Sequence, residues 1–159
     1  MIISNATPLI TFARIGRLDL LQEMVKQLVI PVAVEQEISG YRPTIYGTID
    51  LAKEDWITVK TVVSPKQVQL LLPTLDQGEA EVIALALEQK ARLVLIDELA
   101  GRQVAQSLGL PITGSVGVLI QAKQTGKIQA IKPFVDKMTQ QGIYFSARFI
   151  AQVLKSVGE

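Results

Sequence analysis

The chain contains neither cysteine nor histidine among its 159 residues. The lack of cysteine excludes disulfides, thiolate zinc sites and thiol nucleophiles. The lack of histidine excludes imidazole as a general base, a general acid or a metal ligand. Acid–base or metal chemistry must therefore come mostly from aspartate and glutamate, whose hard oxygen atoms favour magnesium or manganese.

Long apolar runs are also missing. Hydrophobic residues make up 48% of the chain and the mean hydropathy is +0.32, yet no uninterrupted apolar run approaches the ~20 residues of a membrane-spanning helix. The start at Met1 lacks the charged region of a secretory leader, so we expect a cytoplasmic protein. The length predicts one domain over residues 1–159. The net charge of +1 is nearly balanced and does not by itself indicate a nucleic-acid-binding protein.

The stretch LVLIDE, Leu93–Glu98, is the strongest local signal. An apolar, β-rich run of this length is typical of a strand buried on both faces of a parallel sheet. Such a strand delivers the next residues to the carboxyl edge of the sheet, where α/β proteins keep their sites. We therefore expect Asp97 to lie at a sheet edge and to face a crevice.

Strand and helix patterns alternate along the whole chain, which predicts a three-layer α/β/α sandwich with a mainly parallel central sheet. An exposed loop is expected over Gly40–Gly47. The expected strands are Ile2–Asn5, Leu28–Ile30, Trp56–Val59, Leu93–Ile96 and Leu110–Thr113. The expected helices run from Thr7 to Gly16 and over Leu18–Val25, Pro31–Gly40, Ile49–Lys53, Lys66–Leu72, Glu79–Gln89, Leu99–Leu108, Ser115–Lys123, Pro133–Gln141 and Ala147–Val157, the last capped by Ser146.

Several polar residues compete for the crevice beside Asp97, and each has an alternative interpretation. Glu79 opens the clearest helix near its apolar side, but its spacing from Asp76 also fits a capping box. Glu37 borders the buried face of its helix, where most glutamates simply lie at the edge of the hydrophobic core and have no role in a site. Glu98 and Arg102 have the i,i+4 spacing of an ion pair, and Asp97 could cap a helix.

Two further positions follow strands. Asn5 comes directly after the first strand, and Thr113-Gly114-Ser115 comes after the last one. The second segment fits an ordinary helix N-terminus. The same amides and hydroxyls could also hold a phosphate or a metal-bound water.

Three segments of the chain resemble a PIN domain in order and spacing, and together they span nearly its whole length. They are ISNATPLITFARIGRLDLL, VIPVAVEQEI and LDQGEAEVIALALEQKARLVLIDELAGRQVAQSLGLPITGSVGVL. The sequence looks most like an uncharacterised bacterial subfamily with a GEAE-type helix, close to VapC toxins. The resemblance implies a Mg2+- or Mn2+-dependent ribonuclease, plausibly the toxin of a toxin–antitoxin pair, with RNA as substrate, a small antitoxin as partner and a homodimeric state.

Carried over position by position, the resemblance implies a set of site residues. Those that would hold the metal are Asn5, Glu37, Glu79, Asp97 and Glu98, with Glu37, Glu79 and Asp97 as the catalytic acids. Polar residues that would support the metal or its waters are Thr7, Thr113 and Ser115. Asn5 departs from the family pattern because an aspartate usually stands there, and an amide contributes no charge to a metal site.

RNA would also need cations near the acidic residues. Arg14, Arg17 and Arg102 are the candidates for phosphate contact, although most surface arginines are solvated or ion-paired. The Tyr41–Tyr46 loop could stack on bases or form a subunit contact. Asn5 also motivates a rival hypothesis, a non-catalytic PIN-like module that binds RNA or protein. A response-regulator receiver is disfavoured, because the first strand ends in Ser4-Asn5 rather than an acidic pair.

Overall fold

Five parallel strands form the central sheet in the computed structural model, which describes residues 1–41 and 47–159. The strands are β1 (Ile2–Ser4), β2 (Leu28–Pro31), β3 (Ile57–Lys60), β4 (Leu93–Leu95) and β5 (Ile112–Thr113). Their order in the sheet is β3-β2-β1-β4-β5, and each printed pairing is parallel. The five expected strands are therefore confirmed, with shifts of one or two residues at their ends.

The largest shift affects β5, which starts at Ile112 rather than at Leu110. Pro111 accepts a hydrogen bond from Val94 through its carbonyl (2.9 Å). Proline has no N–H to donate, so the regular ladder begins only after it.

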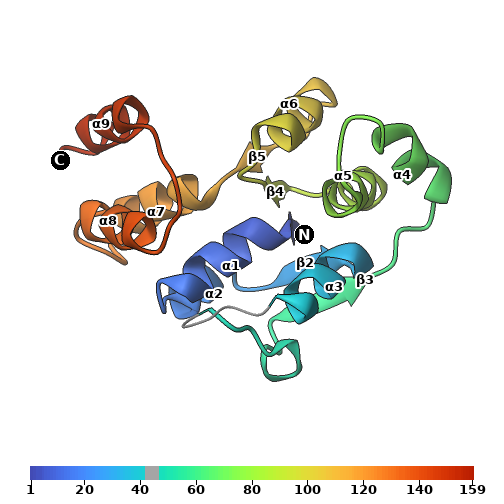
Figure 1. The fold of residues 1–159 in the computed structure, drawn as a ribbon, viewed down its shortest axis with the longest axis horizontal. Coiled ribbons are helices and arrows are strands. Elements are labelled where there is room, and N and C mark those ends of the chain that lie inside the picture. Colours follow the sequence, from blue (N-terminus) through green and yellow to red (C-terminus); the bar gives the residue numbers. More distant parts are fainter. Residues whose placement is uncertain (42–46) are drawn as a thin grey trace.

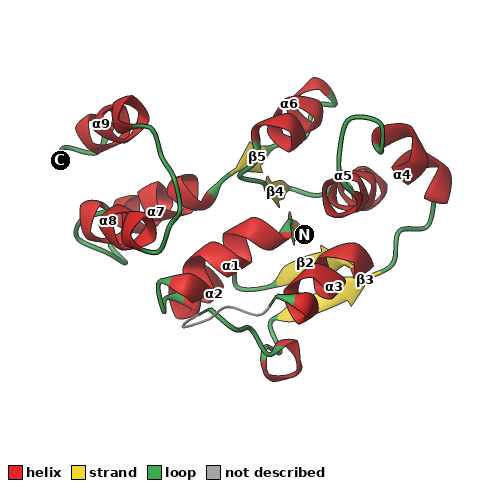
Figure 2. Cartoon of the chain, viewed as in Figure 1, coloured by secondary structure: helices red, strands yellow, loops and turns green. Residues whose placement is uncertain are grey.

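Helices cover both faces of the sheet (Figures 1 and 2). In chain order they are α1 (Ala6–Arg14), α2 (Leu18–Val25), α3 (Val32–Gly40), the short η1 (Leu51–Lys53), α4 (Pro65–Leu71), α5 (Gln77–Gln89), α6 (Leu99–Ser107), α7 (Ser115–Gln124), α8 (Lys132–Gln140) and α9 (Ala147–Ser156). Helix α1 packs against α2, α3 and α7, whereas α5 packs against β1, β2, α4 and α6. The predicted three-layer α/β/α architecture is confirmed.

The strand order explains this layering. From β1 the chain runs outward through β2 to β3, and it then returns to β4 and β5 on the other side of β1. Right-handed crossovers in opposite directions place their helices on opposite faces of a sheet. The neighbours β1 and β4 are therefore the point at which the direction of winding reverses.

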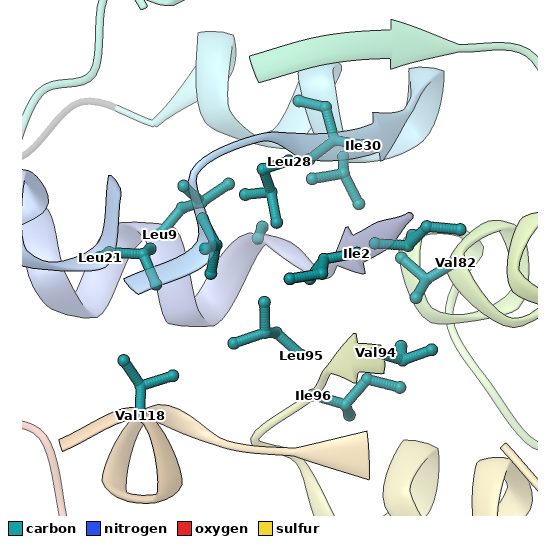
Figure 3. Close-up of a cluster of buried hydrophobic side chains, with 14 of the residues drawn as sticks. Ile2, Leu9, Leu21, Leu28, Ile30, Val82, Val94, Leu95, Ile96 and Val118 are labelled. Atoms are coloured by element: carbon teal, nitrogen blue, oxygen red, sulfur yellow. The ribbon is translucent and has the colours of Figure 1, made fainter. Parts of the chain in front are cut away.

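The LVLI run is apolar because both faces of β4 are covered. Val94, Leu95 and Ile96 are consecutive, so they point to alternate faces, and each is fully buried. Figure 3 shows them in a core to which Leu9 of α1, Val82 of α5 and Val118 of α7 also contribute.

Most helix ends lie where the sequence predicts. Helix α2 has the expected bounds, and the Ser146 hydroxyl caps α9 by accepting from the Phe149 N–H (3.1 Å). Of the expected Gly40–Gly47 loop, residues 42–46 lie outside the described residues, as does most of the Tyr41–Tyr46 segment. Within the described residues, none of the helices combines the length and apolar character needed to cross a bilayer.

Candidate functional site

The candidate site lies where β1 and β4 end, at the reversal point of the sheet. Asn5 follows β1 and its N–H donates to the Leu95 carbonyl (2.9 Å), so the two chain segments leave the sheet together. Asp97 and Glu98 follow β4 two and three residues later. Ligand sites of open parallel sheets form at this kind of point, beyond the carboxyl ends of the strands.

Glu98 is held against the start of α1. The Asn5 side-chain Nδ2 donates to Glu98 Oε2 (3.3 Å), and the Thr7 hydroxyl donates to Glu98 Oε1. Asn5 is 4% exposed, and its Oδ1 is buried with no hydrogen-bond partner among the described residues. The amide of Asn5 thus uses its donor on Glu98 and keeps an oxygen available at the site.

Glu79 divides its two carboxylate oxygens between two roles. The capping box is confirmed: Asp76 Oδ1 accepts from the Glu79 N–H (2.8 Å), and Glu79 Oε1 accepts from the Asp76 N–H (3.4 Å). Glu79 Oε2 is buried and has no partner within the described chain. Burial, reinforced by the nearby Asp76 and Glu98 carboxylates, raises the pKa of Glu79 to about 7. The capping and site interpretations therefore coexist.

Glu37 reaches the same region from α3. A Cβ at Gly78 would collide with Glu37 Oε1 and would lie 3.4 Å from Asn5 Oδ1, so the start of α5 brings these two oxygens near one point. The pKa of Glu37 is raised by burial of its carboxyl and by repulsion from Asp76 and Glu98. Val34 and Ile38 on the same helix are buried, so Glu37 lies at the edge of the core and also contributes to the acidic region.

Asp97 is bound to the start of α7. Its Oδ1 accepts from the Ser115 N–H (2.7 Å) and its Oδ2 accepts from the Ser115 hydroxyl (2.6 Å). Burial raises the pKa of Asp97 and repulsion from Glu98 adds to the rise, while the Ser115 hydrogen bonds and Arg102 oppose it. Asp97 therefore caps a helix, as its alternative interpretation proposes, but the helix is α7 rather than the one that follows Asp97 in sequence.

Glu98 does not form the ion pair that its spacing from Arg102 suggests. Both residues belong to the described chain and no ion pair joins them; Arg102 instead donates through NH1 to the Ile96 carbonyl (2.8 Å). Glu98 acts electrostatically on Glu37, Glu79 and Asp97. Its negative charge thus raises the pKa of each of the other three carboxyls.

The structure does not bring Arg14 and Arg17 to these acids. Helix α1 places Arg14 about 13 Å from its Asn5 end, at 1.5 Å per residue, and Arg14 NH2 donates to the Gln141 carbonyl. Arg17 forms an ion pair with Asp19 (3.0 Å), and its guanidinium lies 5.3 Å from the centre of the Phe134 ring. Arg102 alone of the three candidate arginines lies beside Asp97.

Sequence reasoning missed two features of the site. Asp76 was interpreted only as a cap, but its charge also raises the pKa values of Glu37 and Glu79. Glycines pack directly against the acids: a Cβ at Gly101 would lie 2.7 Å from Glu79 Oε2, and one at Gly114 would lie 2.6 Å from Asp97 Oδ1. The available signal was a glycine directly beside a candidate site residue in each of three segments: Gly78 before Glu79, Gly101 before Arg102 and Gly114 before Ser115.

Thr7, Thr113 and Ser115 lie together with Asp97 and Glu98 on a cavity of about 540 Å³. Thr113 also fits closely against α7, because a Cβ at Gly117 would collide with its hydroxyl oxygen. The polar residues expected to support the acids are therefore beside them.

The chemistry of these groups suits a hard divalent cation. Asn5 and Glu79 each have a buried oxygen without a partner in the part of the chain that the structure describes, and these oxygens lie near carboxylates of raised pKa. Oxygen ligands of this kind are those that magnesium and manganese prefer. Among the residues that the structure describes, no three acidic side chains stand close enough together to hold one ion as they are. Glutamate side chains would have to rotate to complete such a set.

Comparison with known proteins identifies a family. The family model DUF3368, described as a PIN domain, matches residues 1–159. The search of curated proteins returns no match.

Proposed function

The chain belongs to the PIN domain family, whose fold is of the nuclease type, and from this premise we propose that it is a divalent-metal-dependent endoribonuclease. One observation carries the proposal. Side chains with acidic or amide oxygens, which follow β1, β2 and β4 or open α5, gather near the winding reversal of the sheet, and two of their oxygens are buried with no partner among the described residues. Unpaired buried oxygens cost free energy unless a ligand satisfies them.

The residues that we propose to hold Mg2+ or Mn2+ are Asn5, Glu37, Glu79, Asp97 and Glu98. Asn5 Oδ1 and Glu79 Oε2 are the two oxygens with no other partner among the described residues. A bound cation of this kind lowers the pKa of a ligated water and neutralises charge on a phosphate oxygen. That chemistry needs no imidazole and agrees with a chain that has no histidine.

The protein's own groups would orient this site. Ser115 fixes both oxygens of Asp97, and Asn5 with Thr7 fixes both oxygens of Glu98. Glu79 Oε1 is held by the capping box, so within the described residues Glu37 is the proposed acid whose carboxylate accepts no hydrogen bond and would be free to turn toward an ion. Hydrolysis would join a water oxygen to phosphorus and break the bond to the 3′ oxygen, which leaves a 5′-phosphate and a 3′-hydroxyl.

The test is cleavage of single-stranded RNA by the purified protein in magnesium. We expect cleavage that is lost in chelator and in Asp97→Asn. Asp55→Asn is the matched control, because Asp55 is exposed and precedes the amino end of β3, at the opposite edge of the sheet. Undiminished cleavage by Asp97→Asn, with the fold intact, would reject the assignment.

Asn5 favours a second candidate function, a PIN-like module that binds RNA or protein without cutting. An amide in place of a carboxylate removes one negative charge from the site. Calorimetry with manganese on the wild type and on Asn5→Asp separates the two functions: heat of binding in either protein supports the enzyme, whereas no binding in either supports the module.

We further propose that the protein acts as a VapC-like toxin, dimerises and is restrained by a small antitoxin. This role predicts that induced expression of the wild type stops growth of a bacterial host and that expression of Asp97→Asn does not. A small upstream reading frame that overlaps this one, and whose product relieves the arrest, would support the pairing. Growth unaffected by a wild type that cleaves RNA in vitro would argue against it.

A further inference from the structure

The cavity beside the acidic site has two chemically different sides. Asp97, Glu98 and Arg102 belong to its polar side, together with hydroxyls such as that of Ser115. Its other side is apolar and is formed by α7 and by residues 143–153 around the start of α9, including Phe145. A volume of about 540 Å³ is in the range of sites for small organic ligands.

Aromatic side chains on the apolar side are unusually exposed. Tyr144 is 85% exposed and Phe149 is 42% exposed, although both line the cavity. The rings of Phe145 and Phe149 lie 6.3 Å apart, centre to centre, and are tilted by 33°. Exposed rings at the mouth of a cavity offer flat surfaces on which another planar group can stack.

This aromatic segment is tied to the rest of the molecule at both ends. Before α9, the Ile143 N–H donates to the Met138 carbonyl of α8 (3.0 Å), and Arg14 of α1 donates to the Gln141 carbonyl. Beyond the end of α9, Glu159 pairs with Lys123 of α7 (2.9 Å) and accepts from the Ile131 N–H (2.8 Å). The rings are therefore presented by an anchored helix and the segment that precedes it.

Arg102 supplies a cation on the polar side. It donates to the Ile96 carbonyl, and no carboxylate within residues 1–41 and 47–159 forms an ion pair with it. A Cβ at Gly114 would lie 2.6 Å from Asp97 Oδ1 and 3.1 Å from Arg102 Nη1, so the guanidinium stands near Asp97, and Arg102 also lines the cavity. A guanidinium in this position suits a phosphate oxygen.

We propose that this cavity binds one nucleobase of single-stranded RNA, stacked on Tyr144 and Phe149, with the adjoining phosphate beside Arg102 and the acids. The proposal rests on the proposed function and names the flanking nucleotide as a further binding site of the substrate. A nucleotide combines a flat apolar-faced base with an anionic phosphate, and the cavity offers aromatic rings on one side and a cation on the other. An apolar peptide segment would leave the charged side without a partner.

The test measures RNA binding apart from cleavage. Fluorescence anisotropy in chelator gives the Kd of a labelled single-stranded oligoribonucleotide and of the same chain with abasic nucleotides. We expect Tyr144→Leu and Phe149→Leu to weaken binding of the intact RNA by about five- to a hundred-fold, as for loss of one base–aromatic stack. Tyr144→Phe, which keeps the ring, should retain affinity, and abasic RNA should bind all four proteins with similar, weaker affinity.

Leu70→Ala is the control, because Leu70 is 80% exposed on α4 and lies outside this cavity. Equal affinity of the wild type, Tyr144→Leu and Phe149→Leu for intact RNA would overturn the proposal. The same holds if the two variants alter self-association of the protein but not its affinity for RNA. Cleavage in magnesium by a protein that fails this test would leave the nuclease assignment standing. Base-dependent binding by a protein that never cleaves would support the nucleobase site and reject the nuclease.

Discussion

The side-chain amide of Asn5 donates to Glu98 Oε2 at 3.3 Å, although 93 residues separate the two in sequence. An aspartate at position 5 could not donate and would place a second negative charge beside Glu98. The amide and the acid are therefore a matched pair: Glu98 supplies a carboxylate beside position 5, and the Asn5 amide holds it there.

This pairing predicts that Asn5→Asp has opposite effects on folding and on metal binding. Without metal, loss of a buried donor and the new repulsion should lower the free energy of unfolding by about 1–3 kcal/mol. With manganese, the extra charge should raise affinity. Denaturant unfolding and calorimetry measure the two effects.

A second substitution tests whether Glu98 is the cause. In Asn5→Asp combined with Glu98→Gln, the glutamine amide can donate to the new aspartate, so we expect much of the lost stability to return. Strict additivity of the two changes would show that positions 5 and 98 do not interact.

The raised pKa of Glu79 predicts that the metal-free protein becomes less stable as pH rises. Between the ordinary value of 4.5 and about 7, the folded protein holds a proton that the unfolded chain has released. Stability then falls with increasing pH through this interval, and the raised pKa values of Glu37 and Asp97 act in the same direction. Unfolding measured from pH 4.5 to 8 in chelator should show this slope, and Glu79→Gln should reduce it.

Manganese should reverse that dependence, because a carboxylate must lose its proton to bind a cation. Affinity should increase as pH rises through 7. Asp55→Asn serves as the control for both titrations, since Asp55 is an exposed carboxylate at the far edge of the sheet. A wild type whose stability without metal rises from pH 4.5 to 7 would contradict the assigned state of Glu79.

Gly78 gives a test that separates site geometry from folding. Its Cβ would collide with Glu37 Oε1, so Gly78→Ala should displace Glu37 and reduce cleavage and manganese affinity at least ten-fold in our proposal, about 1.4 kcal/mol. Alanine is a better helix former than glycine by about 0.5–1 kcal/mol, which offsets part of any strain in folding. Gly40→Ala is the matched control: Gly40 is also helical, and a Cβ there would meet no atom of the described residues within 4 Å. Equal loss in both variants would remove Glu37 from the site.

Local periodicity explains how much of the fold the sequence predicts. The run Leu93–Ile96 indicates a doubly buried strand, and the apolar spacing of Leu18–Val25 marks α2 to the residue. The capping box, given as the alternative interpretation of Glu79, is confirmed, and the sequence could indicate it because both partners lie within one turn of helix. Signals of this kind depend on neighbours a few residues apart.

Contacts made across the chain carry no such signal. The sequence suggested Arg102, at helical spacing, as the partner of Glu98, whereas its partners Asn5 and Thr7 come from the end of the adjacent strand β1 and the start of α1. The aromatic side of the cavity was missed for the same reason, since apolar residues near Phe149 have the pattern of an ordinary amphipathic helix. Arg14 was proposed from its proximity to Asn5 in sequence, but nine residues of helix carry it away.

Substitution of Ser115 tests how strongly Asp97 depends on the hydrogen bonds that Ser115 donates to it. The Ser115 hydroxyl, which is 1% exposed, donates to Asp97 Oδ2 at 2.6 Å, while the N–H holds the other oxygen. Ser115→Ala should lower the free energy of unfolding by about 1.5–3 kcal/mol, the range for a hydrogen bond to a charged group. Burial keeps the pKa of Asp97 raised and the lost bond no longer opposes it, so that pKa should rise further, as NMR titration of the carboxyl would record. Ser107→Ala is a serine control outside the site: it removes the bond from the exposed Ser107 hydroxyl to the neutral Val104 carbonyl (2.7 Å), which should cost less stability, so cleavage is compared where both variants are fully folded. If cleavage falls as much in Ser107→Ala as in Ser115→Ala, the effect is one of stability; a loss confined to Ser115→Ala places Asp97 at the reaction.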